Sequence, residues 1–151
     1  MTQNNEIEID HTRKDLSLED LINLVLQQLS KARRGELSEK MCSAWAAASL
    51  EAQIQLASEV ADSEFDAREA KNHLENISGE RAIEIRAEDK SDKKITDAAM
   101  VSLLAKDSKV REAKKELADK EKISKKFALI NNTLSNAHIF FRGLDKAFKG
   151  L

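Results

Sequence analysis

The stretch ISKKFALINNTLSNAHIFFRGLDKAFKGL, residues 123–151, decides how the rest of the chain must fold. Apolar residues recur along it in a 4-3-4-3 spacing, and the positions between them are mostly polar or charged. This spacing is typical of a coiled-coil seam, which needs a helical partner. We call the following residues the C-terminal seam: Ile123, Phe127, Ile130, Leu134, Ala137, Phe141, Leu144 and Phe148.

The partner of the C-terminal seam is either another helix of the same chain or the same seam on other subunits. Burying one large apolar side chain contributes about 1.5 to 3 kcal/mol. The rest of the chain has few large hydrophobic residues to set against the seam, so we favour self-association. Because three Phe side chains suit a wider core than two helices provide, we predict a homo-oligomer larger than a dimer in which all eight seam residues take part.

Composition predicts an all-α protein with long helices. The 151 residues include no Pro and four Gly, and 34% of them are charged while 4% are aromatic. Strands favour β-branched and aromatic residues, whereas this chain is rich in Ala, Leu, Glu, Lys and Ser. The single Cys42 cannot form an internal disulfide, and no apolar run resembles a signal peptide or a membrane span. We therefore expect a cytoplasmic protein with no membrane partner, in a bacterial host cell if a phage encodes it.

The chain divides into a flexible arm, residues 1–16, and a single helical domain, residues 17–151, whose last helix, 108–151, carries the oligomerisation contact. Ser17, Thr96 and Asp107 each precede a helical pattern and are predicted N-caps. Gly35 is predicted to end the first helix, and the Ser78–Gly79 pair to interrupt the second. The expected helices cover residues 17–32, 38–77, 81–88, 96–105 and 108–151.

Charge is segregated along the sequence although the net charge is only −2. Residues 41–80 carry two basic and eight acidic side chains, whereas residues 81–151 carry seventeen basic and eleven acidic ones. Nine bases face five acids between residues 106 and 126. This segment is either a solvated helix face joined by pairs such as Glu112 with Lys115 and Glu116 with Lys120, or a surface that binds a polyanion.

Signatures of catalysis are missing from the sequence. It contains no phosphate-binding loop, dinucleotide fingerprint or nucleophile elbow. His11, His73 and His138 are scattered, and Cys42 is not at a metal-ligand spacing from any of them. We predict that the protein is not an enzyme and that it uses neither a metal nor another cofactor.

Two segments resemble the UvsY-like recombination mediator proteins of T-even-like phages. KNHLENISG, residues 71–79, is similar to the family segment KARLDYYSG at the Lys, the Leu, an acidic residue and the final Ser-Gly. LLAKDSKV, residues 103–110, is similar to the family's short helix, Asp-containing break and long terminal helix. The sequence departs from the family at His73, which replaces the second base, and at the missing tyrosines.

The resemblance implies an all-helical, ring-forming protein that binds single-stranded DNA. It also implies that the protein contacts a RecA-like recombinase and a single-strand-binding protein, loading the first in place of the second. The family's DNA contact is carried over to Lys71, and less directly to His73. The full set of candidate DNA-binding residues is Lys71, His73, Arg81, Arg86, Lys90, Lys93, Lys94, Lys106, Lys109, Arg111, Lys114 and Lys115.

A second hypothesis is a non-enzymatic coiled-coil adaptor or scaffold that binds a partner helix through the seam. In that case the lysines only keep the protein soluble. The low aromatic content favours this alternative, because proteins that bind single strands without sequence preference stack bases on aromatic side chains. The segregated charge and the family likeness favour the mediator.

Overall fold

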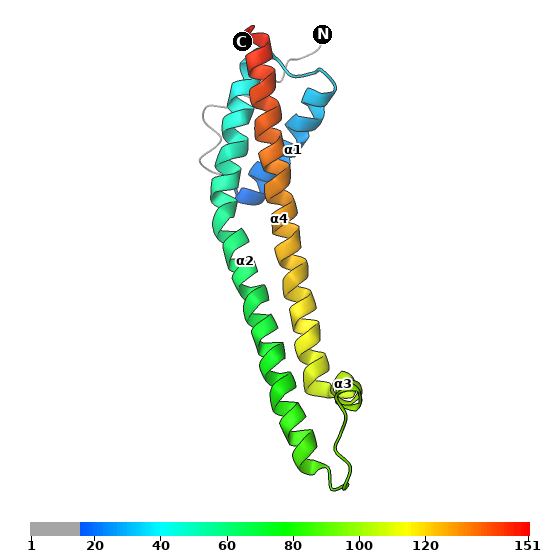
Figure 1. Ribbon diagram of the computed structural model, residues 1–151. Helices are drawn as coiled ribbons and strands as arrows, with labels where there is room; N and C mark the ends of the chain where they lie inside the picture. The colour runs from blue at the N-terminus through cyan, green and yellow to red at the C-terminus, as the bar shows by residue number, and fades with distance from the viewer. Residues whose placement is uncertain (1–15) are drawn as a thin grey trace. The chain divides into compact units, whose positions relative to one another are not determined.

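The computed structural model describes residues 16–151, which form four helices and the segments that join them (Figure 1). The helices are α1 (Leu18–Arg33), α2 (Glu39–Glu88), α3 (Asp97–Lys106) and α4 (Ser108–Phe148). No strand occurs in this range, which confirms the predicted all-α class. The predicted N-terminal arm, residues 1–16, includes His11. Apart from Leu16, this arm lies outside the described residues.

The helix starts confirm the predicted caps. Ser17 Oγ accepts a hydrogen bond from the Asp20 amide at 3.2 Å, and Thr96 Oγ1 accepts one from the Ala99 amide at 3.2 Å. Asp107 Oδ1 accepts from the amides of the second and third residues of α4 at 3.0 and 3.2 Å. Each side chain thus satisfies amides that have no partner inside the helix. Gly35, with a φ of 73°, follows α1 as expected.

The predicted interruption at Ser78–Gly79 is wrong, because α2 is one helix from Glu39 to Glu88. Gly79 does not have the positive φ that ends a helix. Leu74, Ile77 and Ile85 are all partly buried, so the inward face of α2 continues past the glycine. Packing along this face outweighs the cost of about 1 kcal/mol for a Gly inside a helix.

The described chain forms two compact units. Unit 1 contains the chain up to Ser58 together with Leu129–Leu151, and unit 2 contains Glu59–Ala128. Unit 1 therefore holds α1, the first part of α2 and the last part of α4. Unit 2 holds α3 and the remaining parts of α2 and α4.

Unit 1 has the larger apolar core, and the centre of the C-terminal seam belongs to it. Leu134, Ala137 and Phe141 are each 0% exposed within a single chain. This part of the seam is therefore covered by its own chain, which is the alternative that we expected less. The other buried apolar side chains of unit 1 are Leu21, Val25, Leu29, Ala32, Cys42, Trp45, Ala46, Ala48, Ala52 and Leu56.

The ends of the seam differ from its centre. Ile123 remains 45% exposed and Phe148 50% exposed, while Phe127, Ile130 and Leu144 are partly buried. Only these residues of the seam have surface left for contact with another chain. The prediction that all eight seam residues pack between subunits is accordingly wrong for its three central positions.

Unit 2 has a thin core. Its buried apolar side chains are Ala70, Met100, Val110 and Ala113, which are mostly small. Ion pairs supplement this packing: Arg81 Nε donates to Asp107 Oδ2 at 2.7 Å, and Lys120 Nζ donates to Asp66 Oδ2 at 3.1 Å. Both pairs join α2 to α4 or to the residue before it.

Candidate nucleic-acid interface

All twelve candidate DNA-binding residues lie in unit 2. Eleven of them are exposed, and Arg81 is the one that is partly buried. They are spread over four places: Lys71, His73, Arg81 and Arg86 on α2; Lys90, Lys93 and Lys94 on the joining segment; Lys106 at the end of α3; and Lys109, Arg111, Lys114 and Lys115 on α4. Unit 2 therefore draws them from four separate segments of the chain.

Arg81 has a structural partner on each side. Its guanidinium pairs with the carboxylates of Asp107 and Glu84. The hydrogen bond to Asp107, followed by the one to Glu84, raises the pKa of Arg81. The same bond, with help from the amides of Val110 and Lys109, lowers the pKa of Asp107. Because two carboxylates already neutralise it, we remove Arg81 from the DNA-binding surface that we propose.

The largest set of cations on one helix face lies on α4. Its members occupy positions i, i+3, i+4, i+11, i+14 and i+15 from Arg111, a spacing that keeps them on one side of a 3.6-residue helix. Ala118 completes the face at i+7. We call this set the basic stripe: Arg111, Lys114, Lys115, Lys122, Lys125 and Lys126.

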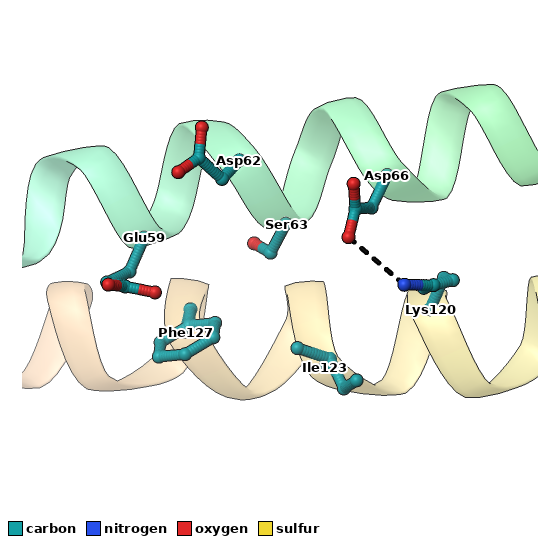
Figure 2. Close-up of a pocket in the computed structure, with 7 residues that line it drawn as sticks. All are labelled: Glu59, Asp62, Ser63, Asp66, Lys120, Ile123 and Phe127. Carbon is teal, nitrogen blue, oxygen red and sulfur yellow. Dashed lines mark hydrogen bonds and ion pairs between the residues drawn. The ribbon is translucent and has the colours of Figure 1, made fainter.

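Every member of the basic stripe is exposed, and none makes an ion pair with a described residue. The stripe spans fifteen helical rises of roughly 1.5 Å, or about 22 Å. The pairs that we expected between Glu112 and Lys115 and between Glu116 and Lys120 do not form. Lys120 pairs with Asp66 instead, because its side chain points toward α2 (Figure 2).

Sequence reasoning counted Lys122, Lys125 and Lys126 in the local charge excess but did not include them among the candidate contacts. Their helical spacing from Arg111 and Lys115 was the signal that could have found them. The remaining candidates outside α4, Lys71 among them, are exposed and make no ion pair with described residues, but they do not share the stripe.

Among the described residues, no group of three His, Cys, Asp or Glu side chains is placed to hold a metal ion. None of the described helices combines the length and the apolar character that a membrane span requires. Cys42 is buried, and desolvation raises the pKa of its thiol. No family model, curated protein or solved structure matches the chain.

Proposed function

We propose that the protein is a recombination mediator that binds single-stranded DNA through the basic stripe. The observation that carries the proposal is the gathering of six exposed cations, free of ion pairs with described residues, on one face of α4. Lys and Arg side chains bind phosphates and release the counterions that the phosphates hold. An exposed stripe of this length can therefore follow the backbone of a nucleic-acid strand.

Binding of this kind carries little sequence preference, because phosphate contacts position a protein without reading bases. The affinity should depend strongly on salt. For single strands, the slope of log affinity against log salt is about 0.7 per phosphate neutralised. If all six cations of the stripe engage, the slope reaches about 4.

The resemblance to phage mediators supplies the rest of the proposal. By that likeness, the protein contacts a RecA-like recombinase and a single-strand-binding protein in the cytoplasm of a bacterial host, and helps the recombinase replace the binding protein. The likeness also supports a homo-oligomer larger than a dimer. The exposed seam residues Ile123 and Phe148 are consistent with contacts between copies.

The test is binding of a fluorescently labelled oligonucleotide of mixed sequence, followed by anisotropy between about 50 and 200 mM salt. A triple variant, Lys122→Ala with Lys125→Ala and Lys126→Ala, should weaken binding and reduce the salt slope by about 2. The matched control removes three exposed charges outside unit 2: Arg33→Ala, Lys40→Ala and Lys146→Ala. It should leave both the affinity and the slope near those of the wild type.

An adaptor that binds a partner helix is the second candidate, and one observation favours it. The segment that carries the basic stripe, residues 111–126, contains no aromatic residue, whereas non-specific single-strand binders usually stack bases on aromatic residues. Absence of oligonucleotide binding at about 50 mM salt, where phosphate contacts are strongest, would leave the adaptor as the better proposal. Equal weakening by the triple variant and its control would remove the stripe as the DNA site.

A further inference from the structure

A groove lies between α2 and α4 within unit 2, with acidic residues on one wall and apolar side chains on the other (Figure 2). Its cavity is about 170 Å³ and is lined by Glu59, Asp62, Ser63, Asp66, Lys120, Ile123 and Phe127, which we call the acidic groove. The three carboxylates come from α2, whereas Ile123 and Phe127 come from α4. Ile123 is 45% exposed, so the groove presents apolar surface that its own unit does not cover.

Acidic residues continue the groove along α4. Glu112, Glu116 and Asp119 are exposed, make no ion pair with described residues and precede Ile123 at helical spacings of three or four residues. Counting 100° per residue, these acids lie roughly 100° around the helix axis from the basic stripe. One surface of unit 2 is therefore acidic with an apolar floor, and a different surface is basic.

We infer that the acidic groove of one copy receives the basic stripe of a second copy. The two surfaces have opposite charge. Apart from the Asp66–Lys120 pair at the edge of the groove, their charged side chains make no ion pair with described residues. Lys side chains bury their methylene stems on apolar surface while their ammonium groups reach carboxylates. Stripe lysines laid in the groove would thus cover Ile123 and Phe127 and pair with Glu59 and Asp62. Ala118 lets the second helix approach closely.

The inference rests on the assembly part of the proposed function and names the contact that forms it. When one copy's stripe enters its neighbour's groove head to tail, each end of the pair keeps one free surface, and such contacts produce closed rings or open filaments. A homo-oligomer larger than a dimer requires this head-to-tail arrangement and not a reciprocal two-fold pair, in which each stripe enters the other copy's groove. Single-stranded DNA and a neighbouring copy would compete for the basic stripe, so added oligonucleotide should reduce the size of the assembly.

Sedimentation velocity at about 50 mM salt tests the contact with two matched variants of the full chain. The groove variant carries Glu59→Gln, Asp62→Asn, Glu116→Gln and Asp119→Asn. The stripe variant carries Lys115→Gln, Lys122→Gln, Lys125→Gln and Lys126→Gln. All eight positions are exposed and free of ion pairs with described residues, so helix content by circular dichroism should not change. Each variant should weaken self-association about tenfold or more.

A control variant removes four exposed carboxylates outside the groove and its α4 extension: Glu64→Gln, Glu75→Gln, Glu88→Gln and Glu121→Gln. It should assemble like the wild type. An equimolar mixture of the groove and stripe variants should form one-to-one complexes and nothing larger, because the mixture has one intact surface of each kind. This recovery also shows that both variants are folded.

Assembly by the groove variant at wild-type strength would overturn the inference, as would a mixture that forms no complex while the wild type assembles. A wild type that stays monomeric would overturn both the inference and the assembly part of the proposed function. Oligonucleotide binding distinguishes failure of the DNA-binding proposal from failure of the inference. A groove variant that dissociates but binds no DNA would leave the inference standing and the DNA-binding proposal refuted.

Discussion

The two units use parts of the same two helices in different ways. In unit 1, α2 and α4 bury Trp45, Leu134 and Phe141 together with a face of α1. In unit 2, the buried positions are mostly Ala or medium-sized side chains, and ion pairs between α2 and the start or middle of α4 supplement them. A long helix can therefore supply a stabilising core along one part of its length and a charged binding surface along another.

The largest effect is expected from a charge placed in the core of unit 1. Leu134→Asp puts a carboxylate at a side chain that is 0% exposed, where no partner is available. An unpaired buried charge costs several kcal/mol, so we expect a loss of about 3 to 5 kcal/mol in the free energy of unfolding. Urea unfolding followed by Trp45 fluorescence measures it, because this single Trp is buried in unit 1.

Leu129→Asp is the matched control for that experiment, since Leu129 belongs to the same helix and unit but is 68% exposed. It should change the unfolding free energy by about 0.5 kcal/mol or less. If Leu134→Asp dissociated an oligomer without destabilising the monomer, Leu134 would be a contact between subunits. The comparison of a buried core with an exposed binding surface would then fail.

The sequence was sufficient to predict the helical class and three helix caps, because periodicity and capping act over short distances. It could not tell which partner covers the C-terminal seam. An apolar stripe has the same spacing whether it packs on its own chain or on another, and the choice depends on how α1 and α2 are placed around it. For the same reason, packing past Gly79 could not be seen in the local pattern.

The candidate interface was predictable in part. The total charge identified the basic segment. The candidate contacts were taken from the first part of that segment without regard to helix face, so Lys122, Lys125 and Lys126 were omitted. Arg81 shows the opposite error, since its partner Asp107 is 26 residues away in the sequence and only the fold brings them together. Ion pairs between distant segments leave no periodic signal.

An intermediate effect is expected at Asp107, which supports unit 2 twice. It caps α4 and pairs with Arg81, so Asp107→Ala should lower the melting temperature of unit 2 by a few degrees. Asp107→Asn keeps a side chain that can cap the helix but removes the charge, so it should lower the melting temperature of unit 2 by less than Asp107→Ala does. Far-UV circular dichroism follows the helices of both units, while Trp45 fluorescence follows unit 1 alone, so a loss of helix signal that precedes the Trp45 transition reports unit 2.

The pH dependence at Asp107 has a defined sign. The Arg81 hydrogen bond lowers the carboxyl pKa in the folded state, so the pair adds stability above the unfolded pKa of about 3.9. That stability is lost as the pH falls through the folded pKa. In the Asp107→Asn variant, the free energy of unfolding of unit 2 should therefore change less with pH below about pH 4 than it does in the wild type. An unchanged acid dependence in this variant would show that the pair contributes nothing to stability.

The smallest effect is expected from two helical glycines, one in each unit. Gly79 lies in α2 within unit 2 and Gly143 in α4 within unit 1. A methyl group added at either position meets no atom within 4 Å, and neither residue has a positive φ. Replacing a helical Gly by Ala restricts the unfolded chain and favours the helix, which should raise stability by about 0.5 to 1 kcal/mol at each site.

The two glycine substitutions sharpen the comparison because they add the same methyl group to different units. Gly143→Ala should raise the urea midpoint that Trp45 fluorescence reports, since both residues belong to unit 1. Gly79→Ala should raise the midpoint of the circular dichroism signal and leave the Trp45 midpoint unchanged. If both substitutions shifted the Trp45 signal equally, the two units would unfold as one cooperative body. The thin core of unit 2 would then draw its stability from the larger core of unit 1, and the charged surface would need no stability of its own.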